Sequence, residues 1–102
     1  MLEINPILFS LSNGIRVAFV KNDAFVGGAI SPGWVMRYKA MNAFTEALPS
    51  LVKSSETHVI GASTEESMWA GVDTALPLEI SAMIHAIQKE TGIKHVIICG
   101  GD

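Results

Sequence analysis

The sequence predicts an α/β fold, in which an antiparallel three-stranded meander is followed by helices and a further strand. Three observations lead to this prediction. In the first third of the chain, short runs rich in β-branched and aromatic residues alternate with turn-forming residues. After Ser31-Pro32-Gly33 the apolar residues recur with a helical period instead. The chain closes with an apolar run and a glycine pair, a pattern typical of a buried strand and the loop after it.

The strands are separated by turn sequences that favour tight antiparallel connections. Three segments have the composition of strands, namely residues 7–12, 15–20 and 24–31. Asn13-Gly14 lies between the first two, and a type I′ turn needs the positive φ that these residues adopt most readily. Lys21-Asn22-Asp23 lies between the second and the third. Two successive tight turns predict a meander, with a single irregular strand through residues 11–16 as the alternative for the first connection.

A helix is expected from residue 34 to residue 48, and it has two apolar faces. One broad face holds Trp34, Tyr38, Met41, Phe44 and Leu48. The second face holds the small or flexible side chains of Met36, Ala40, Ala43 and Ala47. A surface helix normally needs only one apolar stripe. We therefore expect the first face to cover the strands and the second to receive another helix, from the same chain or from a second subunit.

A second helical region is expected after a connection over residues 49–63, in which 57–62 has the composition of a short strand. Ser63 or Thr64 can cap the start of this region. Its apolar stripe consists of Met68, Trp69, Val72, Leu76, Ile80, Met83, Ile84 and Ile87. Pro77 interrupts the stripe, and a proline costs about 3 kcal/mol inside a helix but is tolerated in a first turn. Two helices are therefore favoured, the second starting near Asp73 or Thr74, with Gly92 as the stop.

Composition excludes several classes of protein. The chain has 102 residues, of which 49% are hydrophobic and 17% charged, so one packed domain is expected rather than disorder. A net charge of −3 gives no basic surface for nucleic acid. Cys99 is the only cysteine, which suits a reducing compartment, and no apolar run is long enough to span a membrane. We expect a cytoplasmic protein that binds neither nucleic acid nor membrane.

Two places in the sequence could face a ligand. Thr64 lies at a helix start, where its hydroxyl and the free backbone N–H groups can hold a carboxylate, hydroxyl or phosphate. Gly100 and Gly101 follow the last strand, and α/β proteins gather ligands at strand ends. A plain helix cap and a plain turn are the alternatives. The three histidines have no metal-ligand spacing with each other or with Cys99.

Three separated segments carry a resemblance to a known family. They are FVGGAISPGWVMRYKAMNAFTEALP at residues 25–49, IGASTEESMWAGV at 60–72 and VIICGGD at 96–102. In order and approximate spacing they resemble the C-terminal half of type III pantothenate kinases. The resemblance implies a ribonuclease-H-like half-domain of the acetate and sugar kinase/actin superfamily, truncated here at both ends. It also implies ATP-dependent phosphorylation of pantothenate, the first step of coenzyme A synthesis, by a homodimer.

The resemblance also implies roles for particular residues. Thr64 falls where the family has a threonine that contacts pantothenate, and Gly100 and Gly101 fall on glycines near the nucleotide. The helix over 34–48 matches one used in the dimer contact. Ser10 and Asn13 stand at the first and last positions of an Asp-x-Gly-Thr motif, where the family binds a monovalent cation and ATP. Serine and asparagine supply no charge for a cation or a magnesium–phosphate complex.

Other family motifs do not occur in this sequence. It has no Gly-Ala-Asp-Arg motif, which carries the general base in the family, and no Asp-x-Gly-Asn-Thr phosphate loop. ATP with Mg²⁺ and a monovalent cation, K⁺ or NH₄⁺, are the expected cofactors of the family. No catalytic residue is assigned in this chain, and we expect it to be inactive alone. The alternatives are a non-catalytic remnant that dimerises or binds ligand, and an unrelated α/β binding domain.

Overall fold

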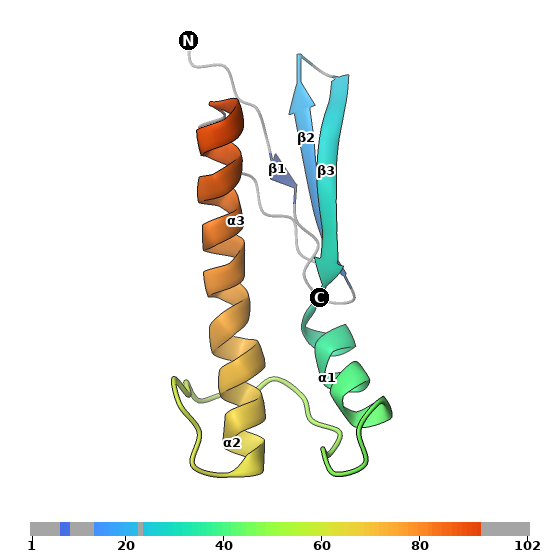
Figure 1. Cartoon of the computed structure of the whole chain (residues 1–102), viewed down its shortest axis with the longest axis vertical. Coiled ribbons are helices and arrows are strands. Elements are labelled where there is room, and N and C mark those ends of the chain that lie inside the picture. Colours follow the sequence, from blue (N-terminus) through green and yellow to red (C-terminus); the bar gives the residue numbers. More distant parts are fainter. Residues whose placement is uncertain (1–6, 9–13, 23, 93–102) are drawn as a thin grey trace.

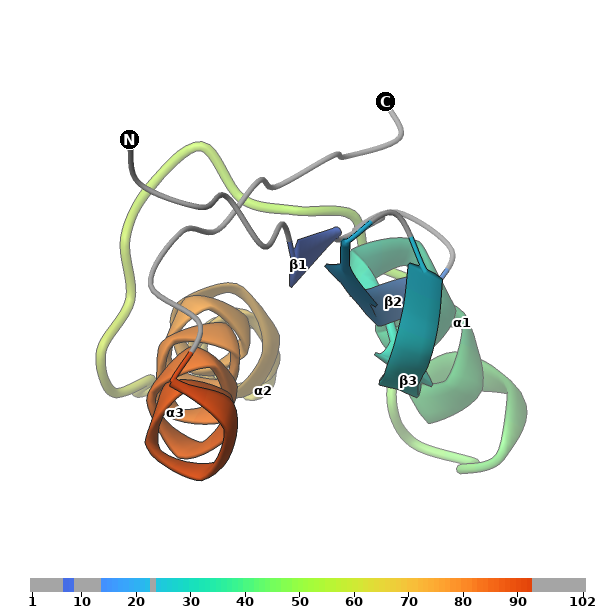
Figure 2. The same ribbon diagram turned by 90° about the horizontal axis from the view of Figure 1, so that it is seen from above.

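A hairpin, a short helix and a long helical rod make up the described part of the chain. The computed structural model describes residues 7–8, 14–22 and 24–92. The rod runs alongside the hairpin, and the short helix α1 (Trp34–Ala43) follows directly from the end of the last strand (Figure 1). Seen from above, the rod lies on one side, with the hairpin and α1 together on the other (Figure 2).

The sheet is dominated by the antiparallel pair β2 (Gly14–Lys21) and β3 (Ala24–Pro32). The predicted turn between them is confirmed, because Lys21 pairs with Ala24 and Asn22 adopts a positive φ of 53°. The register shifts between Phe19 and Val20, which pair with Gly27 and Phe25 and leave one residue of β3 unpaired as a bulge. The two-residue strand β1 (Ile7–Leu8) pairs with β2 on its other edge.

The rod is one continuous helical run with a change of pitch inside it. It consists of α2 (Thr64–Trp69), the π-helical turn η1 (Ala70–Thr74) and α3 (Ala75–Thr91). Pro77 falls in the first turn of α3, but the predicted division into two helices is wrong: Thr74 keeps a helical backbone, and the π turn leads directly from α2 into α3. The run ends at Gly92, whose φ of 74° and N–H bond to the Gln88 carbonyl (2.7 Å) confirm the predicted stop.

The predicted apolar stripe of the rod forms the core. Met68, Val72 and Leu76 are each at most 3% exposed. Leu76 and Ile80 pack with Ile15 of β2, and the cluster is extended by Ala29, Trp34, Met83, Ile84 and Ile87. Side chains spaced four residues apart drift by about 40° per step around an α-helix, and the wider π turn counteracts this drift. Met68, Val72, Leu76 and Ile80 are therefore all buried, and the part of the stripe from Leu76 onward faces the hairpin.

The first helix is shorter than predicted. α1 ends at Ala43, whereas the sequence suggested a helix to residue 48. Beyond Ala43, the Thr45 hydroxyl donates to the Met41 carbonyl and accepts from the Leu48 N–H (3.3 Å), which closes a turn in place of further helix. The prediction that one face covers the strands holds for half-buried Trp34 but is wrong for Phe44, which is 86% exposed.

The predicted strand at residues 57–62 is also wrong. The whole connection from Phe44 to Ser63 contains turns and bends, and no residue in it pairs with the sheet. Val59 and Ile60, which suggested a strand, are 80% and 87% exposed. Their apolar character therefore does not reflect burial in the sheet. The further strand expected near the end of the chain lies outside the described residues.

Candidate functional site

The predicted ligand-facing residue Thr64 lies at the edge of an open cleft of about 630 Å³. One wall belongs to α1 and the turn after it, and the other to the start of the rod. The cleft is lined by Met41, Leu48, Gly61, Ala62, Ser63, Thr64, Ser67 and Met68. Apolar side chains thus stand opposite hydroxyls and backbone amides, the mixture that small-molecule sites usually present.

The rod wall of the cleft is built on a reciprocal helix cap. The Ser63 hydroxyl accepts from the Glu66 N–H (3.1 Å), and the Glu66 carboxylate accepts from the Ala62 N–H (3.2 Å). Ser63 is therefore the cap, and the hydroxyl of exposed Thr64 is not used for that purpose. The sequence allowed two roles for Thr64, helix cap or ligand-facing residue. The cap role is wrong, and the ligand-facing role stays a prediction.

Gly61 allows the connection to pass directly against the helix. A Cβ atom at this position would lie 2.1 Å from the Ser67 nitrogen and 2.5 Å from the Ser67 Cα. Only glycine fits so near to a backbone. The close approach brings the segment before Thr64 onto the first turn of α2, which gives this wall its shape.

The opposite wall is held by the turn that ends α1. The Asn42 side-chain amide donates to the Leu48 carbonyl (2.9 Å), and Thr45 bonds to both Met41 and Leu48. These bonds bring the side chains of Met41 and Leu48, seven residues apart, to the same side of the cleft. The sequence placed both residues on the apolar face of a longer helix, so their role in lining a cleft was missed.

α1 is tied to the rod by two polar contacts that the sequence did not predict. The Tyr38 hydroxyl donates to the Asp73 carboxylate, and the buried position of Tyr38 together with this carboxylate raises the pKa of the phenol. Arg37 forms an ion pair with Glu79 and donates to the Ser31 hydroxyl (3.1 Å) and the Pro32 carbonyl (2.8 Å). Arg37 is therefore held within the chain and is not a free surface arginine.

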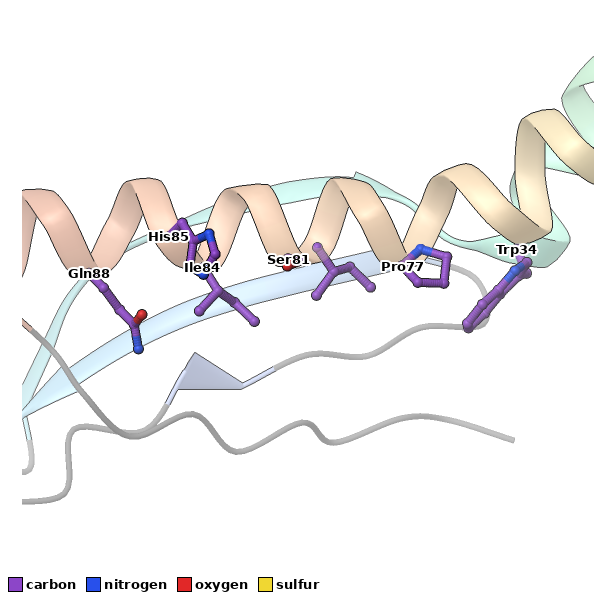
Figure 3. A pocket seen from close by; sticks show the side chains of 7 residues that line it. Trp34, Pro77, Ser81, Ile84, His85 and Gln88 are labelled. Atoms are coloured by element: carbon purple, nitrogen blue, oxygen red, sulfur yellow. The ribbon is translucent and has the colours of Figure 1, made fainter. Parts of the chain in front are cut away.

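A second groove of about 390 Å³ runs along α3, away from Thr64. Figure 3 shows Trp34 at one end and Pro77, Ile84, His85 and Gln88 along the helix; Ile80 and Ser81 complete the lining. Its lining is mostly apolar and contains no lysine or arginine that could balance a phosphate. The groove adjoins the core cluster through Trp34, Ile80 and Ile84, so the cleft at Thr64 is the better candidate site.

The other predicted site residues lie outside the described part of the chain. They are Ser10, Asn13, Gly100 and Gly101. Within residues 7–8, 14–22 and 24–92, no three histidine, cysteine, aspartate or glutamate side chains gather as metal ligands. In the same ranges, no helix has both the length and the apolar character needed to cross a membrane.

Comparison with known proteins identifies the family. Residues 7–86 match the family model described as type III pantothenate kinase, and this range includes the whole cleft. The chain belongs to the type III pantothenate kinase family. A type III pantothenate kinase of Cytophaga hutchinsonii is 36% identical over 99 residues, covering 96% of this chain and 42% of the relative. One of Phocaeicola vulgatus is 42% identical over 79 residues, covering 78% and 33%.

The fold is also found among solved structures. The crystal structure of a Campylobacter jejuni protein named as a Baf family transcriptional activator superposes with a TM-score of 0.59 at 18% identity. The match covers 96% of this chain and 44% of the other, and at this identity it shows the fold alone. The chain thus spans about two-fifths of the length of the type III pantothenate kinases of Cytophaga hutchinsonii and Flavobacterium psychrophilum that it matches.

Proposed function

We propose that this chain forms the pantothenate-facing part of a pantothenate kinase, with the cleft at Thr64 receiving the substrate. The observation that carries this proposal is the family match, which spans the cleft from Met41 to Met68. The hydroxyl of Thr64 is suited to bond a hydroxyl or amide of pantothenate, and Met41 and Leu48 are suited to pack against its carbon skeleton.

In this proposal the reaction is the transfer of the ATP γ-phosphoryl group to pantothenate, giving 4′-phosphopantothenate for coenzyme A synthesis. Such a transfer depends on positioning and on neutralising the charge of the phosphates. In the family that charge is balanced by Mg²⁺ and a monovalent cation, K⁺ or NH₄⁺. Ser10 and Asn13 take the motif positions for the cation and ATP, and Gly100 and Gly101 take the positions near the nucleotide.

The isolated chain is proposed to bind without catalysing. It has no Gly-Ala-Asp-Arg motif, so the general base of the family has no counterpart in this sequence. Ser10 stands in place of an aspartate, which removes a negative charge where a cation would bind. A kinase assay with the purified chain, ATP, Mg²⁺, K⁺ and pantothenate is expected to give no 4′-phosphopantothenate. Product above the background of a Thr64→Val control would contradict the inactivity.

A non-catalytic dimerisation module is the second candidate, and one observation favours it. The outer face of α1 carries an apolar hollow of about 390 Å³ lined by Met36, Lys39, Ala40, Ala43 and Phe44. Met36 is 46% and Phe44 86% exposed, so this face of the 34–48 segment has no cover in the described part of the chain. We propose it as the homodimer contact, in a cytoplasmic protein with a ribonuclease-H-like half-domain.

A further inference from the structure

Asp73 lies where three parts of the chain meet. It belongs to the π turn η1, and its two carboxylate oxygens accept from different segments. One accepts from the Tyr38 hydroxyl on α1, and the other from the Ser54 N–H in the connection (2.8 Å). A hydrogen bond to a charged acceptor is stronger than one between neutral groups. One carboxylate therefore ties the rod, α1 and the connection together.

The same short stretch of the rod holds the rest of the connection. The Trp69 indole N–H donates to the Val52 carbonyl (2.9 Å), and the Thr74 hydroxyl donates to the His58 carbonyl. The His58 ring also stacks on Trp69, with ring centroids 5.3 Å apart and an angle of 25° between the planes. Residues 52, 54 and 58 are thus anchored on residues 69–74.

These anchors determine the shape of the cleft, because the connection begins and ends in its walls. Leu48 lies near its start and Gly61 near its end, and both line the cleft. Tyr38 is three residues before Met41 on α1, and Asp73 is five residues after Met68 on the rod. The Tyr38–Asp73 bond therefore joins the two helices about one helical turn away from the opposed Met41 and Met68.

We propose that Asp73 is a positioning residue for the cleft at Thr64. Its carboxylate fixes the distance between α1 and the rod through Tyr38 and holds the connection through Ser54, so that both walls keep a geometry that can close on a ligand. The nature of that ligand, pantothenate, rests on the proposed function. The π turn fits this role, because it packs against α1 and carries the Asp73 carboxylate that Tyr38 contacts, and such turns recur at functional sites.

The test compares Asp73→Asn with Glu79→Gln in the full chain. Asparagine keeps the shape of the side chain but removes its charge: its oxygen can still accept from the Ser54 N–H while its amide donates to the Tyr38 oxygen, so both bonds become weaker, neutral ones. Glu79→Gln removes the same charge from the rod and weakens the Arg37 ion pair, which does not involve the connection. Urea unfolding of each variant measures its global stability.

The readouts are amide hydrogen exchange by NMR and pantothenate titration. In Asp73→Asn we expect roughly tenfold faster exchange at Ser54 together with shifted amide signals at residues 61–64, since a charged acceptor is replaced by a neutral one. We expect pantothenate affinity to fall by roughly tenfold for the same reason. Glu79→Gln is expected to leave the exchange at Ser54 and the signals of residues 61–64 unchanged, because the Arg37 ion pair does not touch the connection.

Unchanged exchange at Ser54 and unchanged signals at residues 61–64 in Asp73→Asn would overturn the proposal, as would equal changes in Glu79→Gln. If Asp73→Asn does not fold, Tyr38→Phe removes only the hydroxyl, and the signals of Met41 and Thr64 must then both shift. If the wild-type chain does not bind pantothenate, the proposed function fails, while the exchange at Ser54 and the cleft signals still decide the role of Asp73.

Discussion

The backbone of Gly61 lies against the backbone of Ser67, and no side chain fits between them. A Cβ atom on Gly61 would be 2.1 Å from the Ser67 nitrogen and 2.3 Å from the Glu66 carbonyl carbon. The obstructing atoms belong to the first turn of α2, which the Ser63 cap holds in place. The wall of the cleft beside Thr64 therefore depends on a glycine at this position.

Gly61→Ala is predicted to destabilise the chain and to distort the cleft. The added methyl group must push the connection away from α2, and such overpacking costs roughly 1–3 kcal/mol. Gly71→Ala is the matched control, because a Cβ at Gly71 meets nothing within 4 Å and alanine favours a helical backbone. Urea unfolding is expected to show a lower midpoint for Gly61→Ala and an unchanged or higher one for Gly71→Ala. Equal midpoints would contradict the close approach.

Tyr38 gives the chain a measurable response to alkaline pH. It is the only tyrosine, so tyrosinate absorbance reports on it alone. Burial and the Asp73 carboxylate raise its pKa, so above a pH of about 10 the unfolded chain loses the phenol proton while the folded chain keeps it. The free energy of unfolding is therefore constant, as far as this group is concerned, below about pH 10 and falls above it.

The measurement is a pH titration of the folded chain beside one in denaturant. We expect tyrosinate to form at higher pH in the folded chain than in the denatured chain. Asp73→Asn is expected to make the difference between the two titration midpoints smaller. Tyr38→Phe is expected to remove the decrease in the free energy of unfolding at alkaline pH that the tyrosine causes. Coincident titrations of the folded and denatured chains would show that Tyr38 is not buried against Asp73.

The local features of this fold could be predicted from sequence. Ser63, Pro77 and Gly92 act through backbone geometry within a few residues, and the apolar stripe of the rod follows from helical spacing. The contacts of Asp73 could not be predicted from sequence, because Tyr38 lies 35 residues away and only the packed fold brings the two together. The length of α1 was overestimated because apolar spacing alone favours a helix to residue 48. The side-chain bonds of Asn42 and Thr45 close a turn there instead, and they end the helix earlier.

Phe44→Gln is predicted to weaken self-association and to leave the fold unchanged. Phe44 is 86% exposed, so its loss removes little packing within the chain, and surface substitutions of this kind change stability by within about 0.5 kcal/mol. Analytical ultracentrifugation should show a smaller dimer fraction than for the wild-type chain. Leu78→Gln on α3 (65% exposed) is the control and should dimerise normally. A wild-type chain that stays monomeric at high concentration would contradict the dimer proposal.

Binding of pantothenate in the cleft at Thr64 can be measured by an NMR titration. Pantothenate and ATP are added separately to the purified chain, with Thr64→Val as the variant that keeps the side-chain shape but loses the hydroxyl. We predict saturable pantothenate shifts at residues 61–64 and at Met41 and Leu48, strongly weakened in Thr64→Val. Shifts that are absent, or equal in the wild-type chain and in Thr64→Val, would contradict the claim and leave the dimerisation module as the better account.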